Sequence, residues 1–592
     1  MFLFFALPSR SLTSADFIYI DANIGHSSGG HSALKLDNQV YHFQYYPDGI
    51  FRLVRDDWED FTFVYSIMDN RNMVIQKTSL PKTSHDILVQ EFNSYYLIQQ
   101  KHISNIISLR EDIRLLEAYL GNREYALPFY GYFTPAPGGT SLKKIRSLAG
   151  ASALKKARYK LYALLKNIRP ETINLANVKS DIYPRHLASY WSWHHNNILL
   201  KIKLIEAIET GAALKPMSYF GVSSGAGSTS LTEKQKLLLE KELARLEKKT
   251  VSLLEADHDS SPALAVNLAR YLVLQKSVSE NKLFILKCTS QYSSLITSES
   301  HEDKQTAKSL QKEVFVWYYS RLENFFQEMS DENWNSLEDA ANRNYELAYL
   351  INRNVPLRLT FEKLLPEKRG DVVLPPTTDH DTGLELLAKL KGQEKLYYDS
   401  LQKLYNYHLV KKNCSTELFE RIGTIVEKYP ALASDFGSLP RKKMVFIPFY
   451  AARLWKKNMD NVVTEKRDSY RIYKINKMKE NENNLWVSLR EGNTLTSSIY
   501  SYNRDDSFFL FFTDKTRAYR PLFGIVNLAA GLVETATGLF TLPFDKGEHL
   551  QKGIQGTFFS LPELFFFNIR KGSFQFLDSQ EVKNYFDHYE PD

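Results

Sequence analysis

The chain has 592 residues, of which 43% are hydrophobic and 24% are charged, with 26 Gly and 21 Pro. This composition excludes a disordered, collagenous or disulfide-stapled protein and supplies enough apolar side chains for a large buried core. The net charge of +7 is spread without a basic block, so it does not indicate a nucleic-acid partner. The two cysteines, Cys288 and Cys414, are too few for an all-cysteine zinc site, and we predict neither a metal nor a cofactor.

The N-terminus contains an apolar run, residues 1–7, followed by small residues that end at Ala15. This order is typical of the rear half of a secretory signal, although the positively charged leader is missing. We therefore expect residues 1–15 to be a signal-peptide remnant and the protein to be periplasmic or attached to the cell envelope. An ordinary hydrophobic first strand is the alternative.

The next part of the chain changes from strand to helix periodicity. Residues 16–66 alternate apolar and polar side chains, which predicts strands. Helical spacing follows at 83–120 and dominates 141–355. Further helices are expected at 232–256, 262–287 and 382–405.

Beyond residue 440 the pattern predicts short strands and one long apolar helix. The strands are expected at 443–447, 486–489 and 508–512. Residues 521–544 contain a single charged side chain, Glu534, and are long enough for a membrane span. Asn527, Glu534 and three threonines instead favour a helix that is buried or lies at an interface. Either residues 521–567 form a peripheral membrane-contacting surface, or they pack in an ordinary core.

Cys414 is the first candidate for chemistry. Cap-type residues surround it (Asn413, Ser415 and Thr416), and a helical apolar face begins at Leu418. Cys414 is therefore expected at a helix N-terminus, where the N–H groups and the helix dipole favour a thiolate and can hold an oxyanion. A buried apolar cysteine is the alternative.

A histidine hairpin is the second candidate. A turn at Asp37-Asn38 pairs Ala33 with His42 and His31 with Gln44, so His31 and His42 project from one face of the sheet. One ring can act as the base while the other orients it. His31 is the preferred base because it follows Gly29-Gly30, which leave room for a close substrate. Gln44 is expected to supply a hydrogen bond.

Two other interpretations of these histidines remain open. Satisfied polar residues of a sheet are one, and a metal site formed by His26, His31 and His42 is the other. His26 has the opposite strand parity and is the weaker candidate for a base.

At these motifs a resemblance to a known family appears. Segments 29–43 (Gly-Gly-His31…Tyr-His42-Phe) and 407–418 (Tyr407…Asn413-Cys414-Ser-Thr-Glu-Leu) resemble the permuted papain-like, NlpC-type superfamily, which includes lecithin:retinol acyltransferase. More narrowly, they are similar to the periplasmic domain of Bacteroides-type lipoprotein N-acyltransferases. The resemblance implies that Cys414 is the nucleophile, His31 its base and His42 the orienting partner, with Asn413 and Ser415 as supporting motif residues.

The resemblance also implies a domain plan. The fold is expected to be α+β, with a permuted papain-like core of antiparallel sheet plus nucleophile helix. The core halves would be 16–66 and 381–440, split by a mostly helical insertion at 67–380 and followed by a C-terminal α/β extension at 441–592.

The implied activity is thiol-dependent acyl transfer or hydrolysis through a Cys thioester, moving a lipid acyl group to a lipoprotein amine. A peptidoglycan amidase of the same mechanism and a non-catalytic envelope scaffold are the alternatives. The expected partners are accordingly a lipid, a lipoprotein or peptidoglycan.

Overall fold

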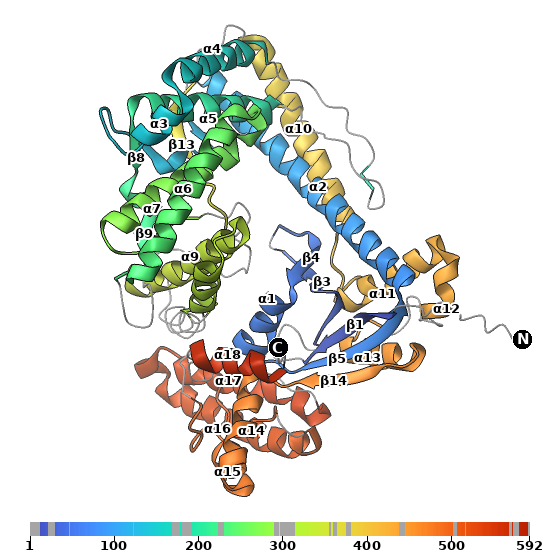
Figure 1. Cartoon of the computed structure of the whole chain (residues 1–592). Coiled ribbons are helices and arrows are strands. Elements are labelled where there is room, and N and C mark those ends of the chain that lie inside the picture. The colour runs from blue at the N-terminus through green and yellow to red at the C-terminus, as the bar shows by residue number, and fades with distance from the viewer. Residues whose placement is uncertain are drawn as a thin grey trace, which may run out of the picture. The chain divides into compact units, whose positions relative to one another are not determined.

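Six strands form an antiparallel sheet in the order β14-β5-β1-β2-β3-β4 in this computed structural model of the chain (Figure 1). The strands are β1 (Leu12–Ile20), β2 (His31–Leu36), β3 (Gln39–Tyr45), β4 (Phe51–Asp57), β5 (Met73–Pro81) and β14 (Val463–Arg467). The protein is therefore α+β, as predicted. The late strand β14 joins the early strands, so part of the expected C-terminal extension belongs to this sheet.

The structure describes most of the chain. The described residues are 12–21, 30–46, 48–121, 124–168, 178–179, 191–222, 230–288, 295–296, 314–315, 317–353, 357–358, 364–374, 380–436, 445–500, 506–514, 517–566, 571 and 579–589.

The chain divides into two compact units. The first comprises Met1–Gln100, Ser300–Glu313 and Gln402–Asp592, and the second comprises Lys101–Glu299 and Val314–Leu401. The sheet unit thus reaches Gln100 rather than ending at residue 66, because β5 and the start of the following helix pack with the sheet. The helical insertion is correspondingly shorter than expected.

The β2–β3 hairpin has the register expected from the sequence. Asp37 turns the chain with a left-handed φ of 54°, and Ala33 pairs with His42. Asp tolerates this conformation better than most non-glycine residues, which is why the Asx pair predicts the turn. His31 and His42 consequently share one face of the sheet.

Helices cover both faces of this sheet. Helix α11 (Cys414–Lys428) packs on β2 and β3, and α13 (Pro448–Asn458) packs on β1 (Figure 1). On this face the ring of Phe17 contacts those of Phe419 and Trp455. On the opposite face, a core cluster joins the sheet to α1 (Trp58–Thr62) and the π-helical turn η1 (Phe63–Met68). Both faces of the sheet are therefore core, which leaves the ends of the strands as the place for a site.

The expected boundary after Ala15 falls inside a strand. β1 begins at Leu12, and Ala15 is fully buried between Leu36 of β2 and Thr78 of β5. Residues 12–15 are thus part of the sheet. Residues 1–11 of the expected signal remnant lie outside the described residues.

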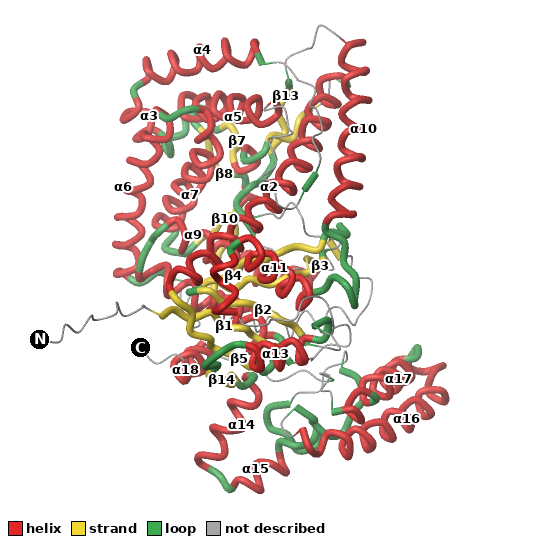
Figure 2. Tube along the Cα trace, turned by 90° about the vertical axis from the view of Figure 1, so that its right-hand side faces the viewer, coloured by secondary structure: helices red, strands yellow, loops and turns green. Residues whose placement is uncertain are grey.

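The second unit is predominantly helical (Figure 2). Its first helix is α2 (Lys82–Leu120), which begins in the first unit. Its other α-helices are α3 (Lys143–Ala149), α4 (Ala151–Asn167), α5 (Trp191–Thr210), α6 (Glu233–Glu255), α7 (Ser261–Ser279), α9 (Asp331–Arg353) and α10 (His380–Leu404). The predicted helices at 83–120, 232–256 and 382–405 are confirmed. The helix expected at 262–287 ends at Ser279, and the chain then forms the short strand β10 (Phe284–Leu286). Three short strand pairs lie between these helices. They are β7 (Phe133–Pro135) with β8 (Ala212–Leu214), β9 (Tyr219–Gly221) with β10, and β6 (Glu124–Leu127) with β13 (Gly370–Val373).

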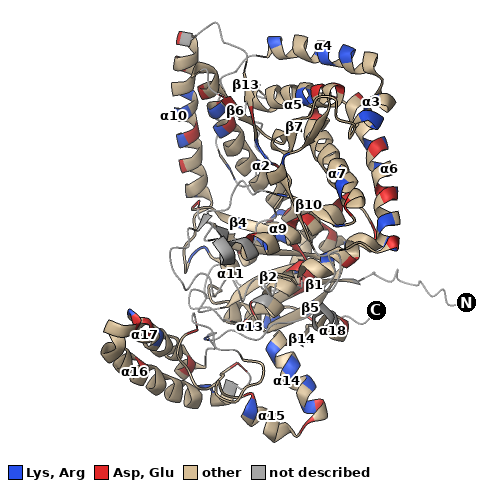
Figure 3. Ribbon diagram, turned by 90° about the vertical axis from the view of Figure 1, so that its left-hand side faces the viewer, with Lys and Arg blue, Asp and Glu red and all other residues tan. Residues whose placement is uncertain are grey.

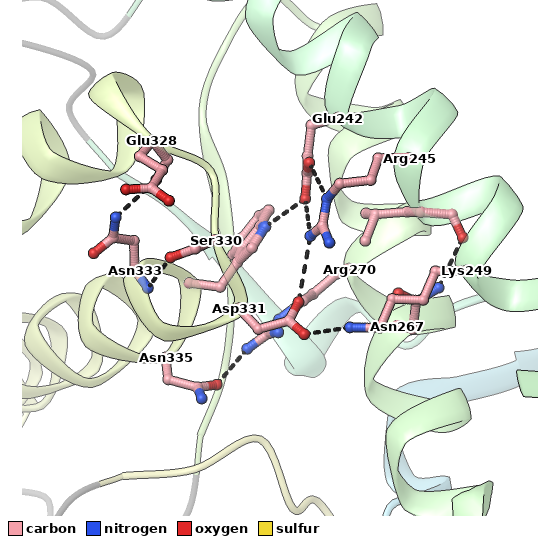
Figure 4. A network of polar contacts seen from close by, with 12 residues as sticks. Glu242, Arg245, Lys249, Asn267, Arg270, Glu328, Ser330, Asp331, Asn333 and Asn335 are labelled. Atoms are coloured by element: carbon pink, nitrogen blue, oxygen red, sulfur yellow. Dashed lines mark hydrogen bonds and ion pairs between the residues drawn. The ribbon is translucent and has the colours of Figure 1, made fainter.

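A buried charge network ties α6, α7 and α9 together (Figure 4). Arg270 donates from Nε and Nη2 to the two carboxylate oxygens of fully buried Glu338, at 3.0 and 2.6 Å. Trp334 donates its indole N–H to Glu242 at 2.9 Å, and Glu242 also accepts two bonds from Arg245. Each buried charge in this network has an opposite charge as its direct partner.

The strands predicted beyond residue 440 are mostly absent from the described chain. Residues 486–489 lie in helix α15 (Asn484–Arg490), because Asn483 caps the N–H groups of Leu485 and Trp486. Residues 508–512 are irregular apart from one bridge at Phe511, since the amide of Asn527 bonds the backbone of residues 510 and 511. Within 443–447, the described residues 445–447 form a turn and a bend.

The remaining described α-helices of this region are α12 (Ala433–Phe436), α14 (Tyr470–Asn481), α16 (Arg520–Asp545), α17 (Glu548–Ser560) and α18 (Ser579–Tyr589). The long helix predicted at 521–544 is confirmed as α16. Only 22% of its most apolar 18-residue window is buried, so this helix lies mostly at the surface of the described chain.

Candidate active site

A chain of hydrogen bonds crosses three neighbouring strands. His31 Nε2 lies 3.1 Å from His42 Nδ1, and His42 Nε2 lies 2.8 Å from the Oδ2 of Asp56 on β4. His42 is fully buried, so both of its ring nitrogens need partners and both have one. The structure therefore brings together the two predicted histidines and adds a carboxylate.

The order of donors in this relay follows from Asp56. An ionised carboxylate only accepts, so His42 Nε2 carries the proton and donates to it. His42 Nδ1 then accepts from His31 Nε2–H, which leaves the lone pair of His31 on Nδ1. Among the described residues, no partner occupies that nitrogen. His31 is thus prepared to take a proton.

The electrostatic surroundings keep His31 neutral. Its pKa lies well below the ordinary value of 6.5, first because of burial, then because of repulsion by His42 and Arg71. The ring also stacks on Tyr65 of η1, with centroids 5.5 Å apart and planes at 15°. A neutral, fixed imidazole is the form that a general base requires.

Cys414 occupies the first turn of α11, as predicted. Asn413 is the N-cap, and its Oδ1 accepts from the N–H groups of Ser415 and Thr416, both at 3.1 Å. Its Nδ2 donates to the carbonyls of Leu409 and Phe446, both at 2.7 Å. Asn413 therefore has a structural role, which is to hold the start of α11.

The sulfur of Cys414 lies against the first residues of β2. The backbone N–H of Ser32, the residue after His31, donates toward this sulfur, and the Ser415 hydroxyl lies 4.0 Å from it. The hydroxyls of Ser32 and Ser415 are 2.8 Å apart and buried, which fastens the helix to the strand across 383 positions of sequence. The motifs from the two ends of the chain thus meet at one strand end.

The predicted resting thiolate is wrong. Burial raises the pKa of the Cys414 thiol above the ordinary value of 9.0, and this effect outweighs the N–H groups of Ser32 and Ser415 and the charge of Arg71, which lower it. At rest the Cys414 thiol and the His31 imidazole are therefore both neutral.

The expected oxyanion donors also change. Because Ser415 and Thr416 already donate to Asn413, their N–H groups are engaged in the cap. The Cys414 N–H, in contrast, has no hydrogen-bond partner among the described residues and is the donor left for an oxyanion.

The structure corrects the roles expected for two neighbours of the histidines, Gly30 and Gln44. Gly30 has a φ of 88°, and a side chain there would come within 2.4 Å of the Ile20 carbonyl oxygen. Its missing side chain thus makes room for the protein's own backbone, rather than for a substrate. Gln44 donates to the Tyr65 hydroxyl at 3.2 Å and supports the stacked ring instead of a histidine. Gly29 and His26 lie outside the described residues.

Three residues at the site were not identified from the sequence: Asp56, Tyr65 and Arg71. Extending the strand pairing to β4 would have found Asp56, since His42 pairs with Val54 and Asp56 lies two residues further, on the same face. Arg71 is buried and donates from Nε to the Asp21 carbonyl at 2.7 Å, while its Nη2 has no hydrogen-bond partner among the residues that the structure describes. No local pattern marks Tyr65 or Arg71, because tertiary packing brings them to the site.

One group of side chains in the described chain has metal-ligand geometry, and it lies in the other unit. His194, His258 and Asp259 place their ligand atoms within 4.8 Å of one another. The His194 Nδ1 and His258 Nε2 atoms are 3.0 Å apart, which is a hydrogen-bond distance. Neither His31 nor His42 belongs to such a group among the described residues.

Comparison with known proteins finds no match to this chain among protein-family models, curated proteins or solved structures.

Proposed function

We propose that the protein is a cysteine acyltransferase or hydrolase that acts through a thioester on Cys414. The observation that carries this proposal is the Asp56–His42–His31 relay, which ends at His31, the residue before Ser32, whose backbone N–H donates toward the Cys414 sulfur. A permuted papain-like core is the fold that this arrangement suggests, with the sheet and α11 as its two parts.

The first half-reaction forms the thioester. His31 Nδ1 takes the proton of the Cys414 thiol while the sulfur attacks an ester or amide carbonyl, and the Cys414 N–H donates to the developing oxyanion. The C–O or C–N bond then breaks, and the leaving group receives the proton from His31. His42 and Asp56 hold the imidazole and stabilise its transient positive charge.

The second half-reaction releases the acyl group. An amine or water gives its proton to His31 as it attacks the thioester carbonyl, the C–S bond breaks, and the proton returns to the sulfur. An amine acceptor makes the protein a transferase, and water makes it a hydrolase.

The substrate that we favour is a lipid acyl ester with a lipoprotein amine as acceptor, in the periplasm or cell envelope. The resemblance of the His31 and Cys414 motifs to the lipoprotein N-acyltransferases supports this choice. A peptidoglycan amide bond is the alternative substrate, and it uses the same residues. A non-catalytic scaffold is the competing class.

Mass spectrometry of the intact chain tests the proposal. After incubation with phospholipid, or separately with muropeptides, we expect an adduct on Cys414 that hydroxylamine removes. The Cys414→Ala variant should carry none, whereas Cys288→Ala should keep it, because Cys288 is buried and its pKa is raised. An adduct that persists in Cys414→Ala, or no adduct with either donor, contradicts the assignment.

A further inference from the structure

Helix α16 exposes apolar side chains along almost its whole length. Except for Thr537, every exposed residue between positions 521 and 544 is apolar. Phe540 and Phe544 are the extreme cases, with 82% and 89% of their surface exposed. The second half of α17 and the turn after it continue the pattern, since the exposed residues from Ile554 to Phe566 are all apolar, whereas the first half of α17 exposes His549 and Gln551. A surface helix of a water-soluble protein has the reverse arrangement.

The buried side of this hairpin is formed by glycines. Gly531 and Gly538 lie two turns apart on one face of α16, and added side chains there would come within 2.7 Å of Thr557 N and 2.2 Å of Leu550 N. Gly553 of α17 faces α16 in the same way, with Thr535 N at 2.3 Å. The two backbones are therefore in direct contact. Small residues at a helix–helix contact are typical of helices that associate in lipid.

Polar and charged groups also lie inside, and they have partners. The Asn527 amide is fully buried and binds the backbone of residues 510–511. Glu563 is fully buried with Lys571 and Thr513 as partners. Glu534, the one charge within 521–544, is partly buried and pairs at 2.5 Å with His549, which is exposed in the first turn of α17. An apolar exterior around paired polar groups is the distribution that a hydrocarbon surrounding requires.

Helix α6 of the second unit provides the contrast (Figure 3). It carries Lys, Arg, Asp and Glu along its length, whereas α16 is almost entirely free of them. With 26 residues at 1.5 Å rise, α16 is about 39 Å long, which exceeds the ~30 Å of bilayer hydrocarbon. Among the described helices, α16 meets the length and apolarity needed to cross a membrane.

We propose that the outer face of the α16–α17 hairpin is embedded in a lipid bilayer. The apolar stretch is bounded by Arg520 at one end and by Asp545 and Lys546 at the other, so charged groups return where the headgroups would lie. A second copy of the chain or another protein would cover a limited patch, but here apolar groups follow the full length of α16. This proposal does not depend on the chemistry of Cys414.

A fluorescence experiment on the full chain tests the proposal. In a Cys414→Ser background, Phe540→Cys is labelled with the environment-sensitive dye NBD and mixed with phosphatidylethanolamine–phosphatidylglycerol vesicles. We expect a blue shift, a severalfold rise in emission, and quenching by nitroxide-labelled acyl chains. Val373→Cys is the matched control, because Val373 is an isolated apolar residue of the other unit with 78% exposure. It should show none of these changes.

The outcomes separate the possible partners. An unchanged spectrum at position 540 overturns the proposal. An emission spectrum that is already blue-shifted without vesicles, and that moves back to longer wavelength when the protein is diluted, also overturns it. In that case a second copy of the chain covers the face. As an unlabelled check, Phe540→Asp with Phe544→Asp should weaken vesicle co-flotation at least about tenfold, whereas Val373→Asp should not change it.

Discussion

Two regions of the protein, the α6–α7–α9 network and the end of β2, use charged and titratable side chains differently. In the α6–α7–α9 network, Arg270 and Glu338 form a two-pronged ion pair. At the end of β2, in contrast, His31 Nδ1 has no partner in the described chain, and neither does Arg71 Nη2. A buried polar group with unused bonding capacity, such as the Arg71 guanidinium, costs stability unless a ligand binds it. The comparison predicts that changes in the network alter stability and that changes at β2 alter reactivity.

The largest effect is expected from His31→Ala. Removing the base should slow thioester formation on Cys414 by about 10²–10⁴-fold, with the unfolding midpoint nearly unchanged because His31 is partly exposed. The rate of adduct formation, followed by intact-mass spectrometry, measures the first quantity, and urea unfolding measures the second. An equal loss of stability and reactivity would remove the distinction between the two regions.

The network should respond in the opposite way to Glu338→Gln. Arg270 would keep its buried charge without a counter-charge, which costs about 3–5 kcal/mol of unfolding free energy. Alkylation of Cys414 by iodoacetamide should keep its rate under native conditions. The control is Glu280→Gln, which breaks the exposed pair with Lys276 and should cost at most about 1 kcal/mol. A slower Cys414 in Glu338→Gln would argue against the comparison.

Local sequence patterns predict one part of this site well. The Asx turn at Asp37 sets the β2–β3 register, and the cap residues around Cys414 set the start of α11. Both features depend on a few neighbouring residues, so the rules for turns and helix caps predict them. The family resemblance also predicts that the histidine motif and the Cys414 motif belong to one site.

The remainder of the site depends on tertiary packing. Arg71 and Tyr65 come to the site because η1 and the turn before β5 fold onto the sheet, and no periodicity encodes that. The state of the Cys414 thiol was predicted wrongly because helix position was weighed without burial, and burial is the larger effect. The strand predicted at 508–512 was wrong for a related reason. The side chain of Asn527, rather than a neighbouring strand, accepts the backbone N–H of Phe511.

The smallest effect is expected from Arg71→Gln, read from pH profiles. The Arg71 charge lowers the pKa of both His31 and Cys414, so its removal should raise both pKa values. At about pH 8 less thiolate is then present, and iodoacetamide should react with Cys414 about 2–10-fold more slowly. The acid limb of the adduct-forming rate, where His31 becomes protonated and ceases to be a base, should move to higher pH. Arg71→Lys keeps the charge and should retain most of the wild-type profile. If Arg71→Lys and Arg71→Gln shift the profiles equally, Arg71 acts through packing against Tyr65, and it belongs with the structural charges of the network rather than with the relay.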